Sequence, residues 1–171
     1  SMTKIMTAVV AIEKLKNLDE RLTIPTSEVQ SLYERGTSVA GFWPGESITV
    51  RDLLYGLMLP SGAECCVALA GAASGNEDVF IKEMNDKAKE IGCTNTVFYD
   101  ASGLDNRNLS TAYDMYLIAN YGMNMEDGRF ATISTTVRHT MKATNKQGER
   151  TITHSNYRML VKSLGGDKYF Y

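Results

Sequence analysis

The 171-residue sequence has few of the residues that mark several protein classes. Its three cysteines, Cys65, Cys66 and Cys93, include two neighbours and do not form the spacing of a disulfide framework. We expect all three to be buried thiols that pack as small hydrophobic groups. The two histidines, His139 and His154, share no metal-ligand spacing with them, so we expect no metal.

Charge of one sign and long apolar runs are also scarce. The formal net charge is -2 and the isoelectric point is about 5.7, which gives no electrostatic reason to expect nucleic acid or an anionic membrane as a partner. No apolar run approaches the ~20 residues of a membrane span, and the chain does not start with a signal-peptide pattern. With 43% hydrophobic residues, a single folded domain over residues 1–171 is expected.

What the sequence does contain is mainly helical periodicity. It predicts helices over residues 2–15, 49–59, 61–73, 76–91, 110–123 and 127–133, and a β hairpin around residues 145–149. The helix over 76–91 is expected to bury Val79, and Thr111 and Asp114 have the spacing of a capping box. We expect a polar connection near Pro25, a turn-rich loop with brief strands over 36–50, and Trp43 covering the helical core.

The first four residues, SMTK, combine a serine with a lysine three positions later on the first predicted helix. Residues i and i+3 share a helix face, so the Ser1 hydroxyl and the Lys4 amine could approach each other. Serine is a weak nucleophile until a neighbouring base takes its proton, and a neutral lysine is one such base. The same letters would also arise if a tag ending in serine preceded a natural Met2, and a solvated lysine is the ordinary alternative.

Ser61 is a second hydroxyl with a distinctive position. It follows Pro60, which forces a break between two predicted helices because the residue before a proline is pushed out of the α region. The ordinary interpretation is a helix cap. The alternative is a hydroxyl that faces Ser1 and Lys4 and passes a proton to a leaving amine.

Three stretches then carry a resemblance. SMTKIMTAVVAIEKL, GESITVRDLLYGLMLPSGAECCVALA and FYDASGLDNRNLSTAYDMYLIA, in this order, resemble signature segments of the serine D-alanyl-D-alanine carboxypeptidases, the low-molecular-weight penicillin-binding proteins. HSNYRML resembles the stretch before that family's third motif. The resemblance implies an α+β, β-lactamase/transpeptidase-like fold. The given chain would be mainly its helical region plus a β ribbon, without most of the main antiparallel sheet.

The family's active site uses S-x-x-K, S-x-N and K-T-G motifs. By resemblance, Ser1 is the acylated nucleophile, Lys4 its general base and Ser61 the proton relay of the second motif. Ala63 occupies the asparagine position of that motif, so only its backbone would remain for substrate binding. No K-T-G is present up to Tyr171, and we expect this segment alone to be nearly or wholly inactive.

The resemblance implies hydrolysis of the terminal D-alanine of peptidoglycan stem peptides, covalent inhibition by β-lactams, no organic cofactor and an extracytoplasmic location. Membrane association of a longer parent protein is left open. A non-catalytic helical scaffold or binding module is the alternative, motivated by Ala63 and the missing third motif. An N-terminal nucleophile hydrolase using the Ser1 amine is disfavoured because such enzymes are rich in strands.

For Tyr99, Asp100 and Ser102 we expect turn formation and loop anchoring, with a substrate-rim role as the alternative. Asn156 and Arg158 are expected to be structural.

Overall fold

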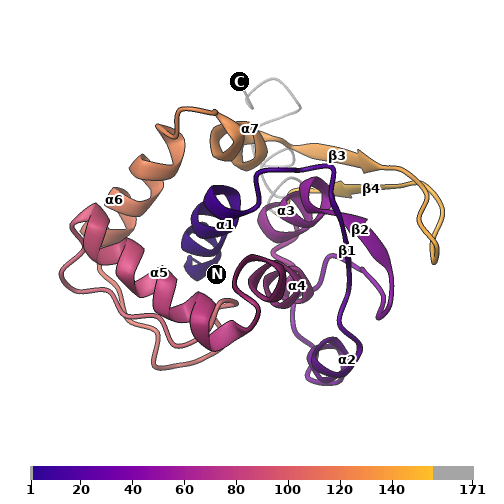
Figure 1. Ribbon diagram of the computed structural model, residues 1–171, viewed down its shortest axis with the longest axis horizontal. Helices are drawn as coiled ribbons and strands as arrows, with labels where there is room; N and C mark the ends of the chain where they lie inside the picture. Colours follow the sequence, from indigo (N-terminus) through magenta and orange to yellow (C-terminus); the bar gives the residue numbers. More distant parts are fainter. Residues whose placement is uncertain (1, 156–171) are drawn as a thin grey trace, which may run out of the picture.

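The computed structural model describes residues 2–155, which form a helical body with two short β ribbons (Figure 1). The helices are α1 (Thr3–Lys14), α2 (Thr26–Glu34), α3 (Val50–Met58), α4 (Ala63–Ser74), α5 (Glu77–Ile91), α6 (Ala112–Met123) and α7 (Arg129–Thr135). The strands are β1 (Arg21–Thr23), β2 (Ser47–Thr49), β3 (Arg138–Met141) and β4 (Arg150–Thr153). Asn156 and Arg158 lie outside the described residues.

Helix α1 lies at the centre of the body, with α3, α4, α5, α6 and α7 around it (Figure 1). Its residues Ala8, Val9, Ala11 and Ile12 are all fully buried. A helix that is apolar on most of its circumference is stable only where neighbours cover it on several sides, which explains the central position. Helix α4 is similarly apolar and packs against α1, α2, α3 and α5.

Each ribbon is a pair of antiparallel strands. In the first, Leu22 of β1 pairs with Ile48 of β2, and in the second, His139 of β3 pairs with Ile152 of β4. The β3–β4 ribbon is the predicted hairpin around residues 145–149. The two ribbons meet where Asn145 Oδ1 accepts a hydrogen bond of 2.8 Å from the Ser47 amide.

The polar connection expected near Pro25 is wrong, because helix α2 follows this residue directly. Val29 and Leu32 are three residues apart and are buried, and α2 packs on α4. Two apolar residues among polar ones are too weak a pattern to predict a helix from sequence, and packing against the rest of the protein stabilises this helix. The position of α2 matters because Tyr33 donates its hydroxyl hydrogen bond of 2.9 Å to the Phe42 carbonyl.

Three further expectations are corrected by the structure. Trp43 is 53% exposed, while its neighbour Phe42 is fully buried and takes the core position. Val79 is 42% exposed, so the buried face of α5 is narrower than its sequence predicts. Thr111 caps α6 by accepting from the Asp114 amide, but the Asp114 carboxylate accepts from the Asn95 amide instead of completing a capping box.

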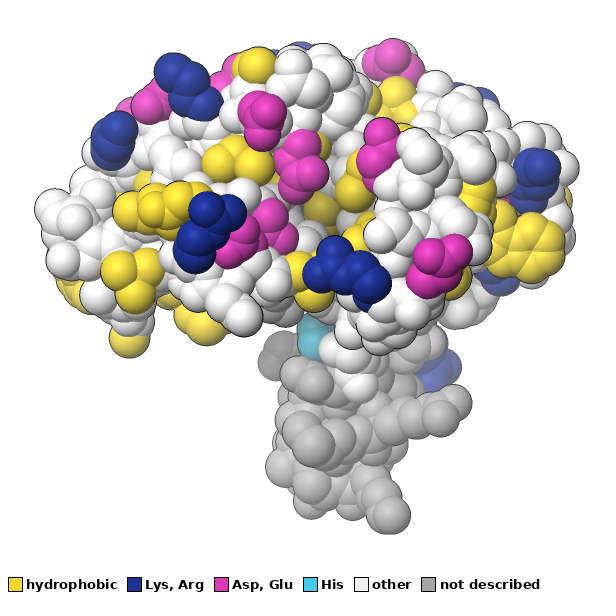
Figure 2. Space-filling model, turned by 90° about the horizontal axis from the view of Figure 1, so that it is seen from below, with side chains coloured by type: hydrophobic (Ala, Val, Ile, Leu, Met, Phe, Trp, Pro, Cys, Tyr) yellow, Lys and Arg dark blue, Asp and Glu magenta, His cyan; other side chains and the backbone are white. Residues whose placement is uncertain are grey.

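Within residues 2–155, no helix combines the length and apolar character that crossing a membrane requires. The same residues contain no cluster of three or more His, Cys, Asp or Glu side chains with the arrangement of a metal site. On the face seen from below, acidic and basic side chains are interspersed with apolar ones (Figure 2). The charge on that face is therefore mixed in sign.

Candidate active site

Lys4 lies in the first turn of α1 and is 5% exposed. Its Nζ donates a hydrogen bond of 2.7 Å to the backbone carbonyl of Ser102, which is 98 residues away in the sequence. A buried lysine needs such an acceptor, since an unpaired charged or polar group in the interior is costly. The contact orients the Lys4 amine.

Ser61 lies in the turn between α3 and α4, and its backbone has a φ of +66°. This left-handed conformation is uncommon for a residue with a side chain. Hydrogen bonds on both sides hold the turn, from the Gly62 amide to the Gly56 carbonyl (2.9 Å) and from the Ala63 amide to the Ser38 carbonyl (2.9 Å). The residue that caps α4 is Gly62, so the expectation that Ser61 is the helix cap is wrong.

Lys4 and Ser61 line one pocket of about 420 Å³. The pocket is bounded by α1, by the end of α3 and by the end of the second ribbon, and its lining residues are Met2, Lys4, Ile5, Leu57, Met58, Ser61, His154 and Ser155. Met2 on its wall is the chain neighbour of Ser1, which lies outside the described residues. The structure therefore brings together two of the three predicted catalytic residues beside the attachment point of the third.

A buried carboxylate supports the Ser61 turn from behind. Glu64 is fully buried, and its Oε1 accepts from three consecutive amides: Ala40 (2.7 Å), Gly41 (2.9 Å) and Phe42 (3.2 Å). Burial raises the pKa of Glu64 above its usual value, and the three amide hydrogen bonds offset this only in part. Burial, with a contribution from the nearby Glu64 charge, raises the pKa of Tyr33 to about 12.

Gly62 leaves no room for a side chain between this carboxylate and the facing loop. A Cβ at Gly62 would lie 2.9 Å from the Ala40 amide nitrogen and 2.9 Å from Glu64 Oε2. Close approach of two backbone segments is what requires glycine here. The Ser61 turn and residues 38–42 thus form one tightly packed unit.

Ala63 offers less to a ligand than its motif position suggested. Its side chain is 1% exposed, and its amide already donates to the Ser38 carbonyl at 2.9 Å. A backbone amide that is engaged inside the protein is not free to bind a substrate. The Ala63 amide is held within the packed turn that follows Ser61.

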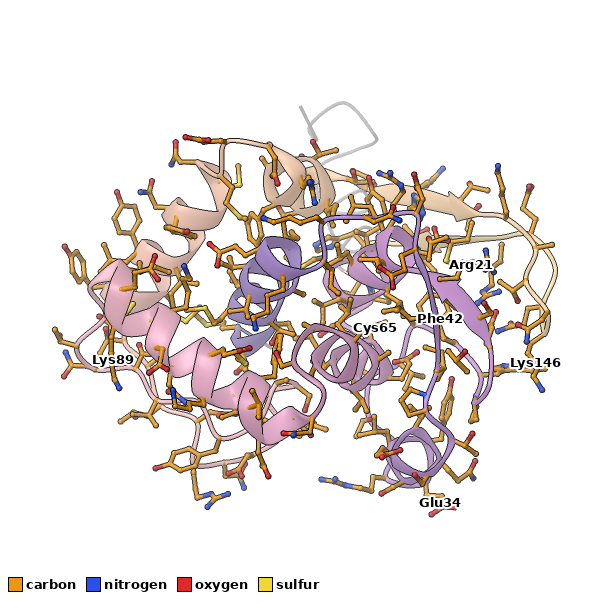
Figure 3. All side chains as sticks on the ribbon, in the orientation of Figure 1. Arg21, Glu34, Phe42, Cys65, Lys89 and Lys146 are labelled. Atoms are coloured by element: carbon orange, nitrogen blue, oxygen red, sulfur yellow. The ribbon has the colours of Figure 1, made fainter. Side chains whose placement is uncertain are left out.

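The thiols near the site are buried. Cys65 and Cys66 follow Glu64 on α4 and are both fully buried. Burial raises the pKa of Cys66 to about 12. Figure 3 shows Cys65 close to Phe42, and a Cβ placed at Gly56 would touch both side chains, at 2.8 Å and 2.5 Å. These thiols are core groups and lack the reactivity of exposed thiolates.

Comparison with known proteins places the chain in a family. A family model described as D-alanyl-D-alanine carboxypeptidase, peptidase S11, matches residues 1–166. The chain belongs to the peptidase S11 family. It is 37% identical over 176 residues to a D-alanyl-D-alanine carboxypeptidase of Streptomyces strain K15, across 97% of this chain. It is also 38% identical over 120 residues to D-alanyl-D-alanine carboxypeptidase DacF of Bacillus subtilis, across 70% of this chain.

Solved structures support the fold of this S11 chain. The crystal structure of the Streptomyces K15 DD-transpeptidase matches with a TM-score of 0.82 and 34% identity, over 91% of this chain and 63% of that one. The predicted transpeptidase-like α+β fold is thereby confirmed. The chain spans 60% of the length of the Streptomyces relative and 31% of DacF.

Several groups at the site were not predicted. They are the Ser102 carbonyl, the Glu64 carboxylate, and His154 and Ser155 on the pocket wall. A backbone carbonyl carries no sequence signal, and the acid at position 64 resembles any helix-start glutamate. The available signals were the family-like segments FYDASGL, which contains Ser102, and HSNYRML, which begins with His154 and Ser155.

Proposed function

We propose that the protein containing this chain is a serine-type D-Ala-D-Ala carboxypeptidase that acts on peptidoglycan stem peptides through an acyl-enzyme. The observation that carries the proposal is the shared pocket of Lys4 and Ser61 at the start of the helix that follows Ser1. Named relatives that are D-alanyl-D-alanine carboxypeptidases add to it. A lysine and a serine are the groups needed to activate one hydroxyl and to protonate a leaving amine.

In this mechanism the Ser1 hydroxyl oxygen attacks the carbonyl carbon of the penultimate D-alanine, and its proton passes to the neutral Lys4 amine. The proton then travels through the Ser61 hydroxyl to the nitrogen of the terminal D-alanine as the peptide bond breaks. An ester on Ser1 remains. Water then attacks the ester carbonyl carbon and gives a proton to Lys4. Lys4 returns this proton to the Ser1 oxygen as the ester bond breaks, so the shortened stem peptide leaves and both groups are restored.

The first test is covalent labelling of the full-length protein by a fluorescent penicillin, which would acylate the same serine. We expect one adduct per molecule on the peptide that contains Ser1, and none in Ser1→Ala. Release of D-alanine from a peptide ending in D-Ala-D-Ala should be lost in Ser1→Ala and Lys4→Ala. Absence of both the adduct and D-alanine release in the unmodified protein would remove the proposal.

The substrate fixes the location and the partners. Peptidoglycan stem peptides lie outside the cytoplasmic membrane, so we propose an extracytoplasmic enzyme. β-Lactams are the proposed covalent inhibitors. The proposed mechanism uses no metal and no organic cofactor, because the side chains of Ser1, Lys4 and Ser61 supply the nucleophile and carry the proton transfers.

One observation favours a second candidate, a non-catalytic helical scaffold or binding module derived from this fold. Ala63 supplies no side-chain amide, and its own amide is engaged by Ser38. This candidate predicts reversible binding of stem peptide without an adduct or D-alanine release. Equilibrium binding measured on the same preparations separates the two candidates.

A further inference from the structure

One carboxylate organises the loop that contacts Lys4. Asp100 Oδ2 accepts from the Ser102 amide (3.3 Å), the Ser102 hydroxyl and the Leu104 amide (2.9 Å). Its Oδ1 accepts from the Gly103 amide (3.0 Å) and the Asn108 side-chain amide. Five donors from four residues converge on a single half-buried side chain, which fixes the backbone of residues 102–104.

The same loop is anchored to the helical core immediately before Ser102. The buried Thr7 hydroxyl on α1 donates a hydrogen bond of 2.6 Å to the Ala101 carbonyl. The Ala101 amide donates to Glu77 Oε1 at 3.2 Å, at the start of α5. Residues 101–104 are therefore held by α1 on one side and by Asp100 on the other.

The consequence of this anchoring is the direction of the Ser102 groups. The Ser102 hydroxyl and amide both point to Asp100, while its carbonyl accepts from Lys4 Nζ at 2.7 Å. A neutral lysine amine has two N–H donors and one lone pair. When one donor is fixed on the Ser102 carbonyl, the rotation of the amine is restricted and its lone pair is limited to fewer directions.

We propose that Asp100 is a positioning residue for Lys4, acting through the Ser102 carbonyl. Asp100 does not line the pocket that Lys4 shares with Ser61, and its link to Lys4 runs through Ser102. Its effect is on the geometry of proton transfer. The inference rests on the proposed function, in which Lys4 is the base that accepts the Ser1 proton.

The charge state of Asp100 fits this role. Burial alone would raise the pKa of Asp100, but the hydrogen bonds from Ser102, Asn108 and the backbone outweigh it and hold the pKa below its usual value of 3.8. The side chain is therefore an acceptor-only carboxylate at neutral pH. An acceptor-only group matches a site where all five contacts are donors.

The test uses the full-length protein and a fluorescent penicillin under rapid mixing. Three quantities are separated: the dissociation constant of the pre-covalent complex, the rate constant of acylation, and the burst amplitude, which counts correctly folded sites. For Asp100→Ala we expect an acylation rate constant reduced by about 10- to 100-fold, because a base misplaced by about 1 Å costs up to that factor. The pre-covalent dissociation constant should change by less than about twofold, since Asp100 lies outside the shared pocket.

Asp100→Asn is the conservative variant. It keeps Oδ1 as an acceptor and replaces Oδ2 by a donor, which opposes the Ser102 hydroxyl and the Ser102 and Leu104 amides. We expect a reduction of the acylation rate constant by roughly 3- to 30-fold, smaller than in the alanine variant. This variant decides the question if Asp100→Ala fails to fold.

Asp114→Asn is the matched control. Asp114 is another carboxylate that organises a loop. It is 1% exposed and anchors a neighbouring turn through the Asn95 amide (2.8 Å) and the Thr96 hydroxyl (2.7 Å). It has no path to Lys4 through the Ser102 carbonyl. We expect its burst amplitude or thermal stability to fall while the acylation rate constant per folded site is unchanged.

Each outcome is informative. An unchanged acylation rate constant in the Asp100 variants, with only the burst amplitude lowered, would make the role purely structural and overturn the inference. Equal losses of rate in Asp114→Asn and Asp100→Asn would overturn it as well, because general loosening would then explain both. If the unmodified protein forms no adduct, the proposed function itself fails, and the inference falls with it.

Discussion

Two loops hold the groups around Lys4 and Ser61, and each is organised by one carboxylate. Glu64 accepts from the amides of residues 40–42 behind the Ser61 turn, and Asp100 accepts from residues 102–104 and Asn108 behind the Ser102 carbonyl. Both carboxylates accept from successive backbone amides. The arrangement is similar, but the surroundings differ.

Burial decides how the two carboxylates behave. Glu64 is fully buried, and the loss of solvation outweighs its three amide hydrogen bonds, so its pKa is raised. Asp100 is half-buried, and its hydrogen bonds outweigh the same penalty, so its pKa is lowered. Asp100 is the more exposed of the two and accepts from more donors, and the balance between desolvation and hydrogen bonding gives the two pKa shifts their opposite directions.

Removal of the buried carboxylate should have the largest effect on stability. Glu64→Ala leaves the amides of Ala40, Gly41 and Phe42 without their acceptor and opens a cavity beneath the Ser61 turn. We expect a loss of about 3 kcal/mol or more in the free energy of unfolding, measured by urea titration. Glu64→Gln, which keeps an acceptor oxygen, is the control and should lose clearly less. Equal losses in the two variants would show that the amide contacts contribute little.

The glycine that lets the two backbones meet is the next target. Gly62→Ala places a Cβ 2.9 Å from the Ala40 amide nitrogen and from Glu64 Oε2, so the turn or the loop must shift. Overpacking of this kind costs about 1–3 kcal/mol. Gly71→Ala on the same helix is the matched control, because its Cβ meets nothing within 4 Å. There we expect a gain of about 0.5–1 kcal/mol from lower backbone entropy in the unfolded chain. Both are read from denaturant midpoints.

The second anchor of the Asp100 loop should matter less. Thr7→Val keeps the shape of a buried side chain but removes the hydroxyl that donates to the Ala101 carbonyl at 2.6 Å. We expect a loss of about 1–2 kcal/mol in unfolding free energy. Thr140 is an exposed residue of the β3–β4 ribbon, so Thr140→Val is the control and should change stability by about 0.5 kcal/mol or less. A loss in Thr7→Val no greater than in this control would contradict the proposed anchoring.

The pH dependence of the free energy of unfolding should distinguish Asp100 from Glu64. These effects are the smallest at neutral pH and the most specific to each carboxylate. Asp100 has a lowered pKa, so its contribution to stability is present above the usual value of 3.8 and is lost as the pH falls through its folded-state pKa. Glu64 has a raised pKa, so the folded state retains its proton longer, and stability decreases as the pH rises from the usual 4.5 through its folded-state pKa. We expect Asp100→Asn to flatten the acidic loss and Glu64→Gln to flatten the decrease above pH 4.5. Denaturant midpoints between about pH 3 and pH 8 measure both slopes. If stability instead rose above pH 4.5 because of Glu64, or rose on acidification because of Asp100, the assigned directions of the two pKa shifts would be wrong.

The missed features have a common physical cause. Helix α2 depends on two buried residues, Val29 and Leu32, and on packing against α4, which no local sequence pattern predicts. The contact of Lys4 with the Ser102 carbonyl spans 98 residues and involves a backbone atom, to which side-chain identity gives no clue. Glu64 accepts from amides of residues 40–42, and this pairing depends on the chain reversal at Gly62. Non-local pairings of this kind are set only when the elements pack.

The sequence by itself determined the positions of six of the helices and the hairpin, since apolar periodicity, Pro60 and Gly92 mark where these elements run and end. It also determined that Lys4 and Ser61 lie at the starts of apolar elements, which made a shared site an obvious hypothesis. Only the tertiary structure decided that Ser61 precedes the cap of α4 with a left-handed backbone, and that one carbonyl orients Lys4. The physical reason is that helix propensity and periodicity are local, whereas the direction of a buried polar group depends on which distant atom satisfies it.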